Sequence, residues 1–152
     1  MSQEHQHRIH LDQMYQEIIR DHTKDPRNYG SLDGPGVISR EGYNPLCGDR
    51  VTVQVKLNDR KDKIEASSFK GEGCSICMAS SSIMAQEIEA LEVDKTKELI
   101  ETLRAVMQNQ KEPAVLEGDL EALSGVRKFP VRIKCALLPW TTLKTALKES
   151  EQ

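Results

Sequence analysis

The chain has 152 residues and a net charge of −3, with only two Phe, three Tyr and one Trp. This length fits one domain with a modest and mainly aliphatic core. The mixed charges argue against nucleic-acid binding through bulk electrostatics, and no apolar run is long enough to span a membrane. Residues 1–10 are polar and lack the hydrophobic segment of a secretory signal, so we expect a cytoplasmic protein. In such a reducing compartment, four cysteines are expected to be metal ligands or reactive thiols.

The first half of the chain predicts one helix followed by an antiparallel meander with one face covered. Apolar residues at helical spacing predict a helix over 9–22, after a stretch 1–8 that we expect to be disordered. Pro26 and Gly30 mark the end of this helix. Three strands are expected, the second of them with strict alternation of apolar and polar residues: 37–40, 51–57 and 64–69.

The second half of the chain predicts helices. Their expected ranges are Cys74 to about Leu91, Lys95 to about Asn109, a short one over 120–123, and a last one from Pro130 onward. Asp94 is expected to cap the second of these helices. Pro139 should kink the last helix or break it into two parts.

Four residues from three distant parts of the sequence are expected to converge on one metal: Cys47, Asp49, Cys74 and Cys135. Thiolates and carboxylates are the ligands that zinc takes in proteins, usually four in a tetrahedron. Cys47 and Asp49 flank one glycine in a tight loop between Pro45 and the following strand. Cys74 lies at a helix start, where the exposed N–H groups favour the thiolate form. We expect Cys47 to be the residue that performs the chemistry.

Cys77 forms a C-x-x-C pattern with Cys74 and admits three interpretations. It is a small buried residue that supports the site, a further thiolate ligand, or the partner of Cys74 in a thioredoxin-like redox pair. The βαβ pattern that usually flanks the redox motif is missing, so we favour them in that order.

Arg132 precedes Cys135 by three residues, so the two side chains are neighbours on a helix. We therefore consider Arg132 a candidate functional residue, against the alternative of an ordinary surface charge. His5, His7 and His10 lie in the polar N-terminal stretch and are expected to be solvated rather than to bind metal.

Several motifs resemble the iron–sulfur assembly proteins of the IscU/NifU type, over nearly the whole chain. They are Asn44-Pro45-Leu46-Cys47-Gly48-Asp49, Gly71-x-Gly73-Cys74-x-Ile76, Ala79-Ser80, the opening segment 11–30, and Cys135 in the last helix. Within that family the chain looks more like the SufU branch. The segment 124–130 resembles the SufU insertion, Lys134 stands where scaffold members have a His, and the Leu-Pro-Pro-Val-Lys motif of scaffold members is missing. Cys77 departs from the family, which commonly has Ser there.

The resemblance implies an α+β fold in one domain over 1–152, with a small antiparallel three-stranded sheet and helices packed on one face. It implies zinc held by Cys47, Asp49, Cys74 and Cys135. It also implies that Cys47 accepts persulfide sulfur from a SufS-type cysteine desulfurase and passes it toward a SufBCD scaffold. Arg132 would then stabilise the anionic sulfur.

Other functions remain open on the same residues. The chain could be a scaffold that assembles and transfers a two-iron, two-sulfur cluster, which Lys134 and the missing scaffold motif disfavour. It could be a non-catalytic zinc module that activates the desulfurase. The C-x-x-C pair leaves a dithiol oxidoreductase as the last alternative.

Overall fold

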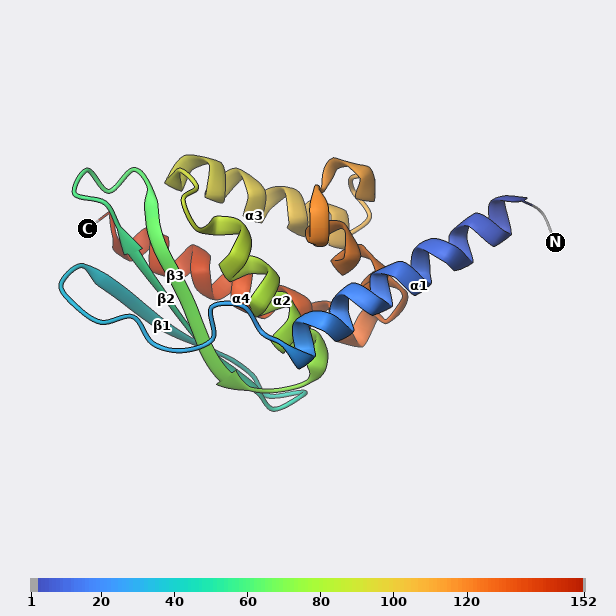
Figure 1. Cartoon of the computed structure of the whole chain (residues 1–152), viewed down its shortest axis with the longest axis horizontal. Coiled ribbons are helices and arrows are strands. Elements are labelled where there is room, and N and C mark those ends of the chain that lie inside the picture. The colour runs from blue at the N-terminus through green and yellow to red at the C-terminus, as the bar shows by residue number, and fades with distance from the viewer. Residues whose placement is uncertain (1–2, 152) are drawn as a thin grey trace.

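The computed structural model describes residues 3–151, with residues 4–9 described by their backbone alone. Its sheet has three antiparallel strands in the order β1-β2-β3, which are β1 Val37–Asn44, β2 Asp49–Leu57 and β3 Ile64–Glu72. The helices gather on one face of this sheet (Figure 1). The predicted α+β class and three-stranded antiparallel sheet are therefore confirmed.

The helices are α1 Gln3–Lys24, α2 Ser75–Ile88, α3 Val93–Met107 and α4 Pro130–Glu149, with 3-10 helices η1 Pro113–Val115 and η2 Gly118–Lys128. The long α4 packs against β1 and β2, whereas α2 packs against β3, α1 and α4. Gly42 permits the close approach of α4 to β1, because a Cβ there would lie 2.0 Å from Thr142 Oγ1.

The core lies between the sheet and the helices. The valines at 51, 53 and 55 are fully buried on the inner face of β2, as their alternation with polar residues predicts. They meet Phe69 from β3 and Trp140 from α4. The indole N–H of Trp140 donates to Ser80 Oγ at 3.0 Å, which satisfies the polar edge of this buried ring.

Several predicted boundaries shift. The first strand continues to Asn44 instead of ending near 40, because every residue of 37–44 is paired with β2. α2 ends at Ile88, just before Ala90 takes a left-handed backbone angle. The expected cap at Asp94 is wrong: the N-cap is Glu92, and Asp94 lies in the first turn of α3.

Other helices also differ from expectation. η2 is longer than the short helix expected over 120–123, and α4 runs through Pro139 without dividing into two parts. α1 begins at Gln3, so residues 3–8 continue the helix where disorder was expected, and Figure 1 shows this end projecting from the body. His10 is exposed, as expected, whereas the side chains of His5 and His7 lie outside the described part.

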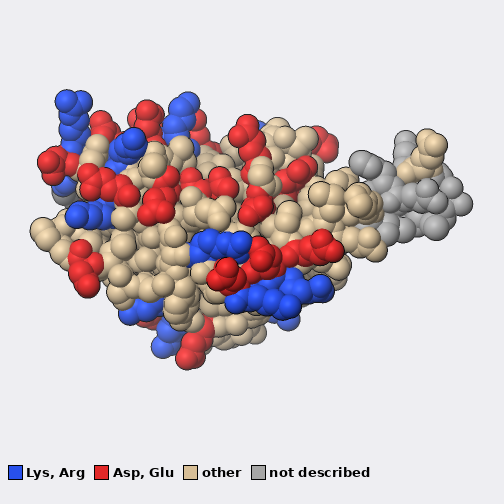
Figure 2. Space-filling model, viewed as in Figure 1, with Lys and Arg blue, Asp and Glu red and all other residues tan. Residues whose placement is uncertain are grey.

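No helix in the described part of the chain is long and apolar enough to cross a membrane. On the face seen in Figure 2, basic and acidic side chains are interspersed rather than gathered into a patch of one sign.

Candidate metal centre

Three segments meet at one end of the sheet. The register places Asn44 opposite Asp49 and Arg50 opposite Glu72, so the β1–β2 loop and the turn from β3 into α2 lie side by side. Figure 1 shows this loop and turn together at the end of the sheet away from the C-terminus. The first turns of α4 bring Cys135 to the same place, since Asn44 Nδ2 lies 3.6 Å from its Sγ.

A compact group of three potential ligands forms there from Cys47, Asp49 and Cys135. One ligand atom from each lies within 4.8 Å of the other two, and the two Sγ atoms are 3.2 Å apart. Asp49 and Cys135 are fully buried, while Cys47 is partly exposed on its loop. The group therefore has one member, Cys47, that is accessible to solvent.

Cys74 adjoins this group through the Asp49 carboxylate. Asp49 Oδ1 accepts a hydrogen bond from the Cys74 backbone N–H at 2.8 Å, and Asp49 Oδ2 lies 3.9 Å from Cys74 Sγ. Cys74 is the N-cap of α2, so the helix start fixes its position. The four predicted ligands thus lie together, with Cys74 just outside the compact group of three.

Gly73 makes this arrangement possible. A Cβ at this position would lie 2.6 Å from Asp49 Oδ1, which is closer than nonbonded atoms approach. A side chain here would therefore displace the carboxylate or the turn that carries Cys74. The sequence motif contained this glycine, but only the structure shows what its missing side chain leaves room for.

Asn44 is a site residue to which the sequence assigned no role. It is nearly buried, and its amide nitrogen lies 3.5 Å from Asp49 Oδ2 and 3.6 Å from Cys135 Sγ. Its Oδ1 accepts a hydrogen bond from the backbone N–H of Leu46 at 3.3 Å. Asn44 therefore contacts two of the predicted ligands, Asp49 and Cys135, and holds the loop that carries Cys47. In the sequence, only its position at the start of the motif 44–49 could have indicated this role.

Burial and hydrogen bonding affect the pKa values of the two buried thiols, Cys77 and Cys135. Burial raises the pKa of the Cys135 thiol, and so do its hydrogen bonds with Asp49 and Cys47. Burial also raises the pKa of Cys77 to about 12, with the charge of Asp49 as the next cause. Without a cation, these thiols keep their protons at neutral pH. A bound metal would reverse this, because thiolates are the form that ligates.

Arg132 is exposed at the start of α4 and faces two of the thiols. The charge of the Cys74 thiolate, followed by hydrogen bonds with Cys135 and Cys74, raises the pKa of its guanidinium. A cationic side chain therefore lies beside these two thiols, where it favours anionic sulfur. Lys134 is also exposed, next to the buried Cys135.

The donor set and its spacing fit a tetrahedral zinc ion. Zinc–thiolate bonds of about 2.3 Å imply ligand atoms about 3.8 Å apart. The separations between Cys47 and Cys135 Sγ and between Asp49 Oδ2 and Cys74 Sγ, 3.2 and 3.9 Å, lie near that value. Small side-chain adjustments would bring all four atoms onto one ion.

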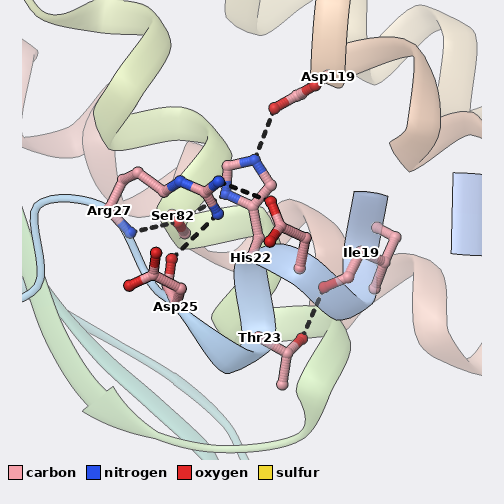
Figure 3. Close-up of polar contacts among 8 residues, drawn as sticks. Ile19, His22, Thr23, Asp25, Arg27, Ser82 and Asp119 are labelled. Carbon is pink, nitrogen blue, oxygen red and sulfur yellow. Dashed lines mark hydrogen bonds and ion pairs between the residues drawn. The ribbon is translucent and has the colours of Figure 1, made fainter. Parts of the chain in front are cut away.

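A second polar cluster ties α1 to α2 and η2 (Figure 3). The fully buried His22 contacts Ser82 Oγ through Nδ1 and Asp119 Oδ2 through Nε2, both at 2.7 Å. The backbone N–H of Arg27 donates to the same Ser82 oxygen. The order Ser-His-Asp resembles a catalytic triad, but Ser82 is fully buried and cannot reach a substrate. This cluster therefore fixes η2 against the helices.

A family model described as the NifU-like N-terminal domain matches residues 14–136. The chain belongs to this family. The matched range includes all four predicted ligands and Arg132. The predicted resemblance to IscU/NifU-type proteins is thereby confirmed.

Individual relatives cover nearly the whole NifU-like chain. The zinc-dependent sulfurtransferase SufU of Bacillus subtilis is 41% identical over 142 residues, 93% of this chain and 94% of the relative. The iron–sulfur cluster assembly scaffold protein IscU of Streptococcus pyogenes is 40% identical over 92% of this chain and 86% of its own length. A crystal structure of a hypothetical protein, 40% identical, superposes with a TM-score of 0.81 over 90% of this chain and 98% of that one.

Proposed function

We propose that the chain is a zinc-dependent sulfurtransferase of iron–sulfur cluster assembly. In this proposal, Cys47, Asp49, Cys74 and Cys135 hold the zinc, and Cys47 accepts persulfide sulfur from a SufS-type cysteine desulfurase. The sulfur then passes toward a SufBCD scaffold. The observation that carries the proposal is the partly exposed Cys47 thiol, 3.2 Å from the buried Cys135 thiol and grouped with the buried Asp49.

Zinc suits this task because it stabilises thiolates and has no redox chemistry of its own. Sulfur transfer requires a thiolate that attacks a persulfide sulfur. Cys47 is the ligand best placed to leave the metal, since it lies on a loop whose Gly48 has a φ of +71°. Asp49 and Cys135 are buried and Cys74 caps a helix, so these three remain in place.

Arg132 has a supporting role in the proposal. Its guanidinium faces the thiols of Cys74 and Cys135 from the exposed start of α4. A persulfide arriving at Cys47 brings an anionic sulfur to the same place. The Arg132 cation would stabilise that anion and so favour the transfer.

The similarity to the Bacillus SufU supports sulfur transfer, whereas the similarity to the Streptococcus IscU favours a cluster scaffold as the second candidate. The same four residues could ligate a two-iron, two-sulfur cluster. Lys134 favours the first function, because its ammonium donates and cannot ligate at the position before Cys135. A non-catalytic zinc module that activates the desulfurase is the third candidate.

One experiment separates these functions. The protein is purified without added metal, its zinc, iron and inorganic sulfide are measured, and sulfide release by a cysteine desulfurase is followed with cysteine as substrate. We expect stoichiometric zinc, increased sulfide release, and a persulfide on Cys47 by mass spectrometry. Cys47→Ser should abolish the increase, while Val115→Ser, which replaces an exposed apolar residue of η1, should keep it.

Each alternative gives a different result. Stoichiometric iron with inorganic sulfide would favour the scaffold. Zinc together with an increase that survives Cys47→Ser would favour the non-catalytic module. Either result would overturn the proposed sulfur transfer.

A further inference from the structure

Three consecutive serines of α2 are fully buried, and each makes its hydrogen bonds in a different direction. Ser81 donates within α2, and Ser82 contacts α1. Ser80 faces α4, because successive residues of a helix are turned by about 100° around its axis. Ser80 therefore joins the helix that Cys74 caps to the helix that carries Cys135.

The Ser80 hydroxyl makes two contacts with one turn of α4. Its Oγ donates to the backbone carbonyl of Ala136 at 2.6 Å and accepts the indole N–H of Trp140 at 3.0 Å. All three residues are fully or almost fully buried, so both contacts are shielded from water. A buried polar group that loses its partner destabilises the structure around it. Ser80 thus holds the turn that begins directly after Cys135.

The same turn of α4 contains Pro139. Proline has no N–H, so the carbonyl of Cys135 lacks the donor that the residue four positions later normally supplies in an α-helix. The helix is therefore missing one internal hydrogen bond at the residue that carries the thiol. The bond from Ser80 to the neighbouring Ala136 carbonyl holds the helix from outside at this point.

The packing of α2 against α4 affects the metal centre, because each helix positions one of the proposed ligands. Cys74 is the N-cap of α2 and Cys135 lies in α4, whereas Cys47 and Asp49 lie on the β1–β2 loop and at the start of β2. The distance between the first two thiols thus depends on how the helices pack. Ser80 lies about 9 Å along the α2 axis from Cys74, at a rise of about 1.5 Å per residue.

We propose that Ser80 is a positioning residue of the metal centre. Through Ala136 and Trp140, it holds Cys135 at the distance from Cys74 that binding to one zinc ion requires. Ser80 acts through the backbone of α4 and is not a ligand itself. This inference rests on the proposed function for its metal, but the placement of Cys135 can also be measured in the metal-free protein.

Ser80→Ala tests this role, with Ser67→Ala as the matched control. Ser67 is a buried serine of β3, and its Oγ donates to the backbone carbonyl of Ala85 at 2.5 Å. Ala85 lies in the last turn of α2, away from Cys74. Both variants therefore lose a buried bond from a serine to a helix carbonyl, but only Ser80→Ala loses it beside a ligand. Urea unfolding of the metal-free proteins measures the general loss of stability in each.

Zinc affinity and the cobalt(II) spectrum report on the centre itself. In competition with a chromogenic chelator, Ser80→Ala should bind zinc roughly 10- to 100-fold more weakly than wild type, whereas Ser67→Ala should keep wild-type affinity. The d–d absorption bands of cobalt(II) depend on coordination geometry, so they should change in Ser80→Ala alone. If Ser80→Ala failed to fold, Trp140→Phe, which removes one of the two contacts, would be compared with Ser67→Ala in the same way.

Alkylation of Cys135 in the metal-free protein measures its placement directly. Cys135 is fully buried, so iodoacetamide reaches its thiol only when α4 opens locally. Ser80→Ala should raise the rate of this alkylation, followed by mass spectrometry, about 10-fold, because the local opening loses a buried hydrogen bond. Ser67→Ala should alkylate Cys135 at the wild-type rate.

Two results would overturn the positioning role. Wild-type zinc affinity and cobalt bands in Ser80→Ala would show that Ser80 does not act on the centre. Equal changes in Ser80→Ala and Ser67→Ala would show general destabilisation only. Absence of persulfide on Cys47, or iron in place of zinc, would overturn the proposed function instead, and cobalt titration and alkylation would still decide the role of Ser80.

Discussion

Asp49 performs two tasks that substitution can separate. Its Oδ1 accepts the Cys74 N–H at 2.8 Å, while its Oδ2 points toward Cys74 Sγ at 3.9 Å and is the proposed ligand atom. Asp49→Ala removes both oxygens. Asp49→Asn can keep an oxygen for the N–H but places an amide nitrogen, which does not ligate, where Oδ2 lies.

The magnitudes follow from these contacts. In the metal-free protein, Asp49→Ala leaves a donor at the α2 start without its acceptor, which should lower the free energy of unfolding by about 1–3 kcal/mol. Asp49→Asn should lower it by less than about 1 kcal/mol, since that hydrogen bond remains. Both variants should bind zinc at least roughly 100-fold more weakly, and each hundredfold removes about 2.7 kcal/mol of zinc-dependent stabilisation.

Urea unfolding with and without a chelator measures the first quantity, and competition with a chromogenic zinc chelator measures the second. Asp62→Asn is the matched control, because Asp62 lies in the β2–β3 hairpin and pairs with Asn58 instead of a thiol. Wild-type zinc affinity in Asp49→Asn would show that Asp49 is not a ligand. Equal destabilisation of the two metal-free variants would refute the separate role of the Cys74 hydrogen bond.

Two further predictions concern a close contact and a titrating group. Gly73→Ala should weaken zinc binding roughly 10- to 100-fold by chelator competition, because the new Cβ would lie 2.6 Å from Asp49 Oδ1. Glu87→Gln should raise the free energy of unfolding at neutral pH, because burial, followed by the charge of Asp119, raises the pKa of Glu87. The folded protein therefore holds the Glu87 proton more tightly than the unfolded chain does. The free energy of unfolding of wild type thus falls as pH rises from about 4, and the stability gained by Glu87→Gln should vanish below that pH.

Each of these two substitutions has a control variant. Glu72→Ala changes the exposed residue before Gly73 and should leave zinc affinity unchanged; equal loss in both variants would argue against the contact with Asp49. Glu17→Gln, which changes an exposed carboxyl of α1, is the control for the loss of one negative charge. A Glu87→Gln gain that persisted at pH 3 would contradict a titration origin.

Residue types and their spacing were enough to predict the features of this protein that depend on local chemistry. Alternation of valines with polar residues in 51–57 required a strand with one buried face, and that face is fully buried. The types and motif context of Cys47, Asp49, Cys74 and Cys135 predicted a metal centre with thiolate and carboxylate ligands. The same motifs indicated the family to which the chain belongs.

Local sequence patterns did not predict the boundaries of strands and helices where long-range packing sets them. The first strand extends to Asn44 because β2 pairs with it, which no propensity within 37–44 reveals. α3 starts at Val93 although Asp94 is the better capping residue, and α4 continues through Pro139 in the packed core. Tertiary contacts outweigh single-residue preferences at these positions.

The internal geometry of the candidate metal centre likewise depends on tertiary structure. Only the fold shows that Asn44 contacts Asp49 and Cys135, that Gly73 leaves space for Asp49, and that Cys77 is fully buried. Each relation joins atoms from segments far apart in the chain. The sequence determined which donors this protein carries, whereas strand register and helix packing decided which of them meet, because distances between remote residues exist only after folding.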